Sequence, residues 1–213
     1  MELQNLKINF LGDSITEGWG STNRFEDSFI PLLSKKYPTL TCRNYGLSGT
    51  RIARQHTPSE NPQCDMDFCS RFVEMDEDAD VVVVFGGTND FGHGDASFGT
   101  MADRTPDTFY GAMHFLCRGL IAKYPKADIV FMTPLHASYE RKNKRGFALK
   151  QYVDIIREVC EYYSLPVLDL WANSGIALHV SPQKELYSKD GLLPNDAGYA
   201  RLCRRVEAFL MAL

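Results

Sequence analysis

Short apolar runs alternate with amphipathic stretches along the whole chain. Five apolar runs predict β-strands, at Lys7–Leu11, Thr39–Tyr45, Asp80–Phe85, Asp128–Met132 and Pro166–Leu170. The amphipathic stretches carry apolar residues at helical spacing, and they predict helices over Phe25–Lys36, Asp107–Tyr124, Gly146–Tyr163 and Pro194–Leu213.

The third strand indicates how the elements are arranged. After its first residue, Asp80–Phe85 is apolar at every position, and Gly86 and Gly87 end it. Continuous apolarity is typical of a parallel strand that is buried on both faces. Strands separated by helices therefore predict an α/β fold with helices on both faces of a parallel sheet. No linker or internal repeat interrupts the pattern, so residues 1–213 are predicted to form a single domain.

Composition narrows the class of protein. Hydrophobic residues make up 44% and charged residues 23% of the 213 residues, which is typical of a globular protein. The formal net charge of −4 gives no basic field that would attract nucleic acid or an anionic membrane. Apolar runs such as Val81–Phe85 are far shorter than the ~18 residues that a transmembrane helix needs.

Cysteine usage and the start of the chain bear on metal binding and location. The six cysteines are scattered, with no CxxC pair and no Cys/His cluster at zinc spacing, so no metal site is expected. No signal-like segment opens the chain, which predicts a cytoplasmic protein with reduced thiols. A chain whose signal had been removed would read the same way.

Polar and glycine-rich segments follow the first two predicted strands. In open α/β sheets the ligand cleft lies at the carboxyl ends of the strands. Ser14 follows the first strand within Gly12-Asp13-Ser14-Ile15-Thr16, and the helix start there offers backbone N–H groups. The alternative is that Ser14 only caps that helix. The second strand is followed by Gly46-Leu47-Ser48-Gly49-Thr50, where glycine allows close backbone approach but a plain turn is the alternative.

Two further segments follow the same logic. Gly86-Gly87-Thr88-Asn89-Asp90 comes directly after the third strand, and Asn89 could direct its amide into the cleft. The alternative is an Asx turn in which Asp90 acts as a cap. Asp190 lies in Asp190-Gly191-Leu192-Leu193-Pro194-Asn195, just before the last predicted helix, and this segment could equally be a loop with an N-cap.

Taken together, GDSIT, the glycine loop, GGTND and DGLLPN occur in this order over nearly the whole chain. The set resembles the SGNH (GDSL-like) hydrolases, a family of esterases, lipases and carbohydrate deacetylases. The resemblance implies a three-layer α/β/α, flavodoxin-like fold with a five-stranded parallel sheet in the order 2-1-3-4-5. It also implies hydrolysis of a small-molecule acyl ester through an acyl-serine intermediate, without a metal or organic cofactor.

The resemblance further implies roles for individual residues. Ser14 matches the nucleophile, and its own N–H, the N–H of Gly49 and the side chain of Asn89 match the oxyanion hole. Asp190 matches the carboxylate that orients the general base. These residue types suit the chemistry, because a serine attack on an ester needs preformed donors at about 2.7–3.1 Å from the developing oxyanion.

The sequence departs from the family pattern at one position. The family carries its general-base histidine three residues after the aspartate, where this chain has Leu193. Loss of the triad histidine in a serine hydrolase costs about 10⁶ in kcat. One interpretation is that another histidine is the base, with His136 first because it follows the fourth strand. His179 and His93 come next. His56 lies in a long predicted loop, and His114, on a predicted helix, is expected to be structural.

Two other interpretations remain open. Asp190 or a water molecule could act directly on Ser14, although a carboxylate with a pKa near 3.9 is a weak base at neutral pH. The protein could instead be a binding protein that keeps the pocket without turnover. Retention of Ser14, Gly49 and Asn89 favours a hydrolase. An acylated carbohydrate is one candidate substrate, since aromatic side chains near the strand ends can stack on sugars or simply pack (Trp19, Phe91, Phe98, Tyr110 and Tyr139).

Overall fold

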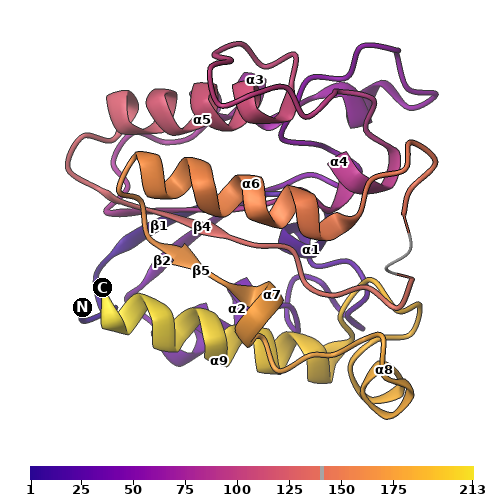
Figure 1. Ribbon diagram of the computed structural model, residues 1–213. Coiled ribbons are helices and arrows are strands. Elements are labelled where there is room, and N and C mark those ends of the chain that lie inside the picture. The colour runs from indigo at the N-terminus through magenta and orange to yellow at the C-terminus, as the bar shows by residue number, and fades with distance from the viewer. Residues whose placement is uncertain (140–141) are drawn as a thin grey trace.

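The computed structural model of the protein describes residues 1–139 and 142–213 (Figure 1). Within this part of the chain, five parallel strands form one sheet in the order β2-β1-β3-β4-β5. This confirms the predicted fold class and strand order. The strands are β1 (Lys7–Gly12), β2 (Thr41–Gly46), β3 (Val81–Phe85), β4 (Asp128–Met132) and β5 (Val167–Leu168).

Helices cover both faces of the sheet, which gives three layers (Figure 1). The helix α5 (Phe109–Lys123) and α6 (Leu149–Tyr162) lie on one side, and α2 (Phe29–Lys36) and α9 (Asp196–Ala212) lie on the other. Shorter helices lie in the connections: α1 (Ser14–Glu17), η1 (Pro62–Asp65), α3 (Phe68–Arg71), η2 (Phe72–Glu74), α4 (Thr88–His93), α7 (Leu170–Asn173) and α8 (Ser181–Tyr187).

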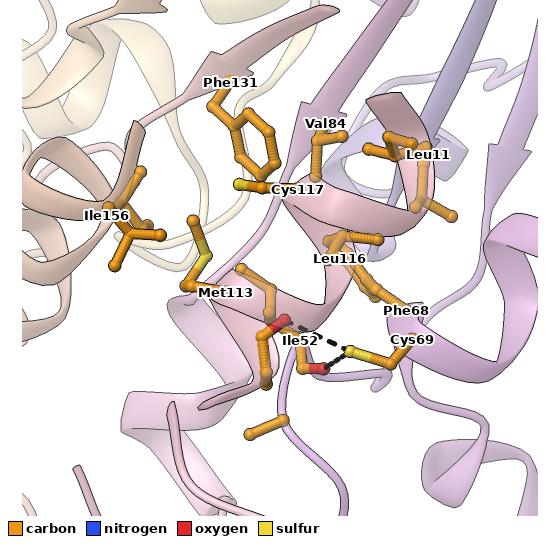
Figure 2. Packing of buried hydrophobic residues seen from close by; sticks show 14 of the residues in the cluster. Leu11, Ile52, Phe68, Cys69, Val84, Met113, Leu116, Cys117, Phe131 and Ile156 are labelled. Atoms are coloured by element: carbon orange, nitrogen blue, oxygen red, sulfur yellow. Dashed lines mark hydrogen bonds between the residues drawn. The ribbon is translucent and has the colours of Figure 1, made fainter. Parts of the chain in front are cut away.

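The continuous apolar run of β3 is explained by this layering. Val82 and Val84 belong to the core cluster under α5 and α6, whereas Val81, Val83 and Phe85 belong to the cluster under α2 and α9. Alternate side chains of a strand point to opposite faces of the sheet, so both faces must be apolar. Figure 2 shows the α5/α6 cluster, in which sheet residues pack against Met113, Leu116, Cys117 and Ile156.

Several predicted element ends are wrong, among them the start of the helix predicted from Gly146, which begins at Leu149, and of the strand predicted from Thr39, which begins at Thr41. The last strand stops at Leu168, because the Asp169 carboxylate accepts the N–H of Ala172 at 3.1 Å and begins α7. The last helix begins at Asp196, since Asn195 caps it through the N–H of Gly198, and Pro194 therefore lies outside it. The first predicted helix begins at Phe29, four residues later than expected.

The described residues form no disulfide bond and no membrane-spanning helix. All six cysteines have free thiols, including Cys64 and Cys69. The Sγ of Cys69 instead donates to the backbone oxygens of Ile52 and Ala112, both at 3.4 Å (Figure 2). None of the helices among the described residues is sufficiently long and apolar to cross a membrane.

The register of the strands aligns their carboxyl ends. Gly12 of β1 faces both Gly46 of β2 and Phe85 of β3, and Phe85 in turn faces Met132 of β4. The segments that follow these strands therefore start at one edge of the sheet. In Figure 1 this edge carries α1, α4 and α7, and both termini lie at the opposite end of the molecule.

Candidate active site

Ser14 is the first residue of α1, and its neighbour Asp13 caps that helix. The Oδ1 of Asp13 accepts the N–H of Ile15 at 3.0 Å. The cap role considered for Ser14 is therefore filled by Asp13. Among the described residues, no side chain forms a hydrogen bond with the Ser14 hydroxyl, which is half-buried at the sheet edge. The hydroxyl is thus available for other chemistry.

Asp13 itself lies in an unusual electrostatic environment. Its side chain is 2% exposed, and burial raises its pKa to about 7. The charge of Asp90 raises this pKa further, while the Ile15 N–H and the guanidinium of Arg71 oppose the shift. A buried carboxyl with a strongly raised pKa therefore lies beside Ser14 in the chain.

Asp90 is the second buried carboxyl of the site. It lies inside α4, which is capped at Gly87, so it does not cap an Asx turn as the sequence also allowed. Its carboxylate accepts the N–H groups of Ile52 and Ala53 at 3.0 and 2.9 Å. Burial raises its pKa to about 6. Asp90 therefore fixes the backbone that continues from the glycine loop after β2.

The glycine loop after β2 is bonded to the Ser14 turn. The N–H of Leu47 donates to the backbone oxygen of Gly12 at 3.0 Å, and the N–H of Ser48 donates to Glu17 Oε2 at 2.8 Å. Gly49 has a φ of +80°, and a Cβ at this position would lie 2.4 Å from the Sγ of Cys64. Glycine is therefore favoured at this position, because the backbone is left-handed and Cys64 lies against it.

Arg71 joins the same two segments, although the sequence gave no signal for it within a long irregular region. Its Nη2 donates to the backbone oxygen of Gly12 and to Thr50 Oγ1, both at 2.9 Å. Its Nη1 donates to the backbone oxygen of Tyr45 at 2.8 Å. Desolvation lowers the pKa of this guanidinium, which belongs to a half-buried residue.

Asn89 connects α4 to the glycine loop. Its Nδ2 donates to the backbone oxygen of Thr50 at 2.9 Å, and its Oδ1 lies 3.2 Å from the Nε2 of His93. The structure thus brings the segments of Ser14, Gly49 and Asn89 together. Asn89 also lines a cavity of about 240 Å³, together with Thr88, Phe91, Gly92, His93, Ala137, Tyr139, Leu149 and Leu192.

Asp190 is exposed, and its carboxylate forms hydrogen bonds within its own loop. Its Oδ1 accepts the N–H groups of Leu192 and Leu193, both at 2.8 Å. Leu193 lies close to Gly20, which follows α1: a Cβ added at Gly20 would be only 2.8 Å from the Cβ of Leu193. Leu193 also packs on the apolar cluster under α2 and α9. The N–H of Ser138, after β4, donates to the backbone oxygen of Gly191 at 2.8 Å. The Asp190 segment therefore lies between the connections that follow β4 and α1.

The histidines are distributed over different surroundings. The ring of His136 lies against Trp171 with centroids 3.9 Å apart, and the ring of His179 lies 4.9 Å from it. His136 and His179 line another cavity, of about 270 Å³, at α7 and α8. His114 is fully buried, with Nδ1 3.0 Å from the hydroxyl of Tyr163, which fits the structural role expected of it. The base role of His136 stays a prediction.

Only two of the aromatic residues considered for sugar stacking are well exposed. Trp19 is 47% exposed and Tyr139 is 44% exposed. Phe91, Phe98 and Tyr110 instead pack with the core cluster under α5 and α6. For metal binding, no group of three His, Cys, Asp or Glu side chains within residues 1–139 and 142–213 is arranged to hold an ion.

Comparison with known protein families identifies the chain. The model of the GDSL-like lipase/acylhydrolase family matches residues 10–201, which include Ser14, Gly49, Asn89 and Asp190. The chain belongs to this family. Membership supports a hydrolase, as the order of the motifs indicated. No curated protein matches the sequence of this GDSL-like family member.

Solved structures resemble this GDSL-like family member along its whole length. A protein from Lactobacillus plantarum has 28% sequence identity and a TM-score of 0.86, with 99% of each chain covered. A possible lipase from Chitinophaga pinensis has 19% identity and a TM-score of 0.76, with coverage of 97% and 98%. The lipase/acylhydrolase from Enterococcus faecalis has 20% identity and a TM-score of 0.66, with coverage of 96% and 95%. The last two likenesses concern the fold.

Proposed function

We propose that this protein hydrolyses a small carboxylic ester, with Ser14 as the nucleophile. One observation carries the proposal. The Ser14 hydroxyl has no side-chain partner among the described residues, and Ser14 lies at the start of α1. The turn that carries Ser14 is hydrogen-bonded to the loop of Gly49, and the Asn89 side chain is hydrogen-bonded to the same loop. Membership of the GDSL-like family supports a hydrolase.

In the proposed reaction the Ser14 oxygen attacks the ester carbonyl carbon, and a base takes the hydroxyl proton. The bond to the alcohol then breaks, the alcohol takes the proton, and water hydrolyses the acyl-serine. The N–H groups of Ser14 and Gly49 and the amide of Asn89 donate to the oxyanion. Each such donor typically contributes a factor of about 10²–10³ in rate.

His136 remains our proposed base, with Asp190 as its orienting carboxylate. Support comes from the adjacency of their loops, since the Ser138 N–H donates to the backbone oxygen of Gly191 at 2.8 Å. One observation favours a second candidate function. Leu193 places an apolar side chain beside Gly20, where the family pattern has its base, and this suits a protein that binds an ester without turnover.

The sequence expectations on substrate and location enter the proposal as follows. The exposed rings of Trp19 and Tyr139 keep an acylated carbohydrate as a candidate substrate, because a sugar ring can stack on an aromatic face. A cytoplasmic location stays a prediction.

Intact-mass detection of a fluorophosphonate adduct tests the nucleophile without knowledge of the substrate. We expect one adduct on the wild type and none on Ser14→Ala, because the probe reacts with an activated serine. His136→Ala should slow labelling by several orders of magnitude, and Leu193→His should change it little. A folded wild type that stays unlabelled, but is labelled after Leu193→His, would support the binding protein instead.

A further inference from the structure

The amide of Asn89 is held at both ends. Its Nδ2 donates to the backbone oxygen of Thr50 at 2.9 Å, and its Oδ1 lies 3.2 Å from His93 Nε2. His93 is four residues further along α4, so the two side chains share one face of the helix. One N–H of the amide remains for a ligand. The direction of that N–H depends on which end of the amide faces His93.

The backbone oxygen of Thr50 constrains one end of the amide, and Arg51 constrains the other end through His93. The Nη1 of Arg51 lies 2.6 Å from the Nδ1 of His93. A guanidinium can only donate, so Nδ1 must accept, and the ring proton of the neutral imidazole then lies on Nε2. The Nε2–H donates to the Oδ1 of Asn89. The opposite amide orientation would leave two donors facing one another.

The Arg51 guanidinium is itself fixed in place. Its side chain is 2% exposed, and its Nη2 donates to Asp65 Oδ1 at 2.9 Å, to the backbone oxygen of Cys64 at 2.8 Å and to Ser59 Oγ at 3.1 Å. Partial desolvation and the Arg51 charge both lower the pKa of His93, although its side chain is exposed.

We propose that Arg51 and His93 are positioning residues that orient the Asn89 amide, so that its free N–H is directed to the oxyanion of the ester reaction. The proposal rests on the proposed function, because an oxyanion donor matters only if Ser14 attacks an ester. Neither residue touches the reacting atoms. His93 acts through the amide of Asn89, and Arg51 acts through the tautomer of His93.

Two variants of His93 separate orientation from simple packing. His93→Phe keeps a ring of similar size but removes both nitrogens. His93→Gln supplies an N–H for the Oδ1 of Asn89 and an oxygen for Arg51. With p-nitrophenyl acetate we expect His93→Phe to lower kcat by about 10- to 100-fold with little change in KM, since a misdirected donor costs less than a deleted one. His93→Gln should recover most of that loss.

The rate of fluorophosphonate labelling at Ser14 should follow the same order. Equal labelling of the wild type and His93→Phe would overturn the positioning role while leaving the proposed function intact. So would a change confined to KM, or a His93→Gln variant as slow as His93→Phe. Thermal unfolding of each variant checks that the compared proteins are folded.

A measurement without activity keeps the two proposals distinguishable. The nitrogen-15 resonances of the His93 ring report its tautomer in the wild type at neutral pH. We expect the Nε2–H form, and an Arg51→Met variant, which offers Nδ1 no donor, should show a larger share of the Nδ1–H tautomer. An Nδ1–H form in the wild type would overturn this proposal. Absence of labelling together with an Nε2–H ring would overturn only the proposed function.

Discussion

The residue before Ser14 determines what the serine can do. Asp13 caps α1 through the N–H of Ile15, so the Ser14 hydroxyl need not take that role. The same carboxyl is almost fully buried, and this raises its pKa to about 7. The cap that leaves Ser14 available therefore lowers the stability of the folded protein in a pH-dependent way, because a buried Asp13 carboxylate is less favourable ionised than protonated.

Asp13→Asn tests this cost. In the wild type, the folded state binds the Asp13 proton more tightly than the unfolded state does, whose pKa is near 3.8. The free energy of unfolding should therefore decrease as pH rises from about 4 to about 7, by at most about 4 kcal/mol from this group. Asparagine keeps the acceptor for Ile15 and does not ionise.

Urea unfolding at pH 5 and pH 8 measures the difference. Between pH 5 and pH 8, we expect the free energy of unfolding to decrease less in Asp13→Asn than in the wild type. Part of the decrease should remain in the variant, because Asp90, with a pKa of about 6, also ionises in this range. Identical pH dependence in the two proteins would contradict the assignment of this burial cost to Asp13.

At the scale of elements, the site depends on where the connections after the strands are bonded to one another. The glycine loop after β2 contacts the β1–α1 turn through Leu47 and Ser48, and Arg71 of α3 bonds both segments. Gly49 lies in the left-handed region against the Sγ of Cys64. Gly49 therefore lies where η1, which contains Cys64, packs against the glycine loop.

Gly49→Ala should therefore lower both stability and labelling of Ser14. A left-handed φ costs an alanine about 1–2 kcal/mol, and the Cβ would also clash with Cys64 at 2.4 Å. Gly146→Ala is the matched control, because its φ of +82° is nearly the same and no described atom lies within 4 Å of the added Cβ. Thermal unfolding and labelling rates are compared for the two variants.

A double variant isolates the clash from the backbone strain. With Cys64→Ala, the nearest remaining atom of residue 64 would be its Cβ at 3.5 Å from the new Cβ, an ordinary contact. Gly49→Ala with Cys64→Ala should then resemble Gly146→Ala in stability. If it remained as unstable as Gly49→Ala alone, the contact with Cys64 would not be the cause.

At the scale of the whole molecule, stability and chemistry are located in different places. Two buried clusters, one on each face of the sheet, hold the layers together. The polar residues of the site lie at the carboxyl edge of the same strands, where the connections meet (Figure 1). Changes in the middle of the layers should therefore alter stability with little effect on the reaction.

Leu116→Ala tests this separation. Leu116 of α5 is fully buried against the sheet (Figure 2), and a buried leucine truncated to alanine costs about 2–5 kcal/mol. Ile121 of the same helix is 36% exposed, so Ile121→Ala should cost much less. Urea unfolding gives both costs. Ser14 labelling of the folded variants should equal that of the wild type, and slower labelling of folded Leu116→Ala would contradict the separation.

The sequence by itself determined the sheet, its helical layers and the order of the site segments. Apolar runs such as Val81–Phe85 are local patterns, and the register of parallel strands carries the segments after them to one edge. The segments of Ser14, Gly49 and Asn89 could therefore be placed at one edge before any contact was known. The family resemblance assigned these residues to one site, and their catalytic roles stay predictions.

Only the tertiary structure decided which partner each polar group takes. Arg71 forms a hydrogen bond with Gly12, which is 59 positions away in the sequence, and Asp90 forms one with Ile52, which is 38 positions away. Such partners depend on how the connections pack, and burial of the same groups shifts the pKa values of Asp13 and Asp90. Neither packing nor burial of a single polar residue is contained in the local pattern of the sequence, because both arise from segments that are distant in the chain.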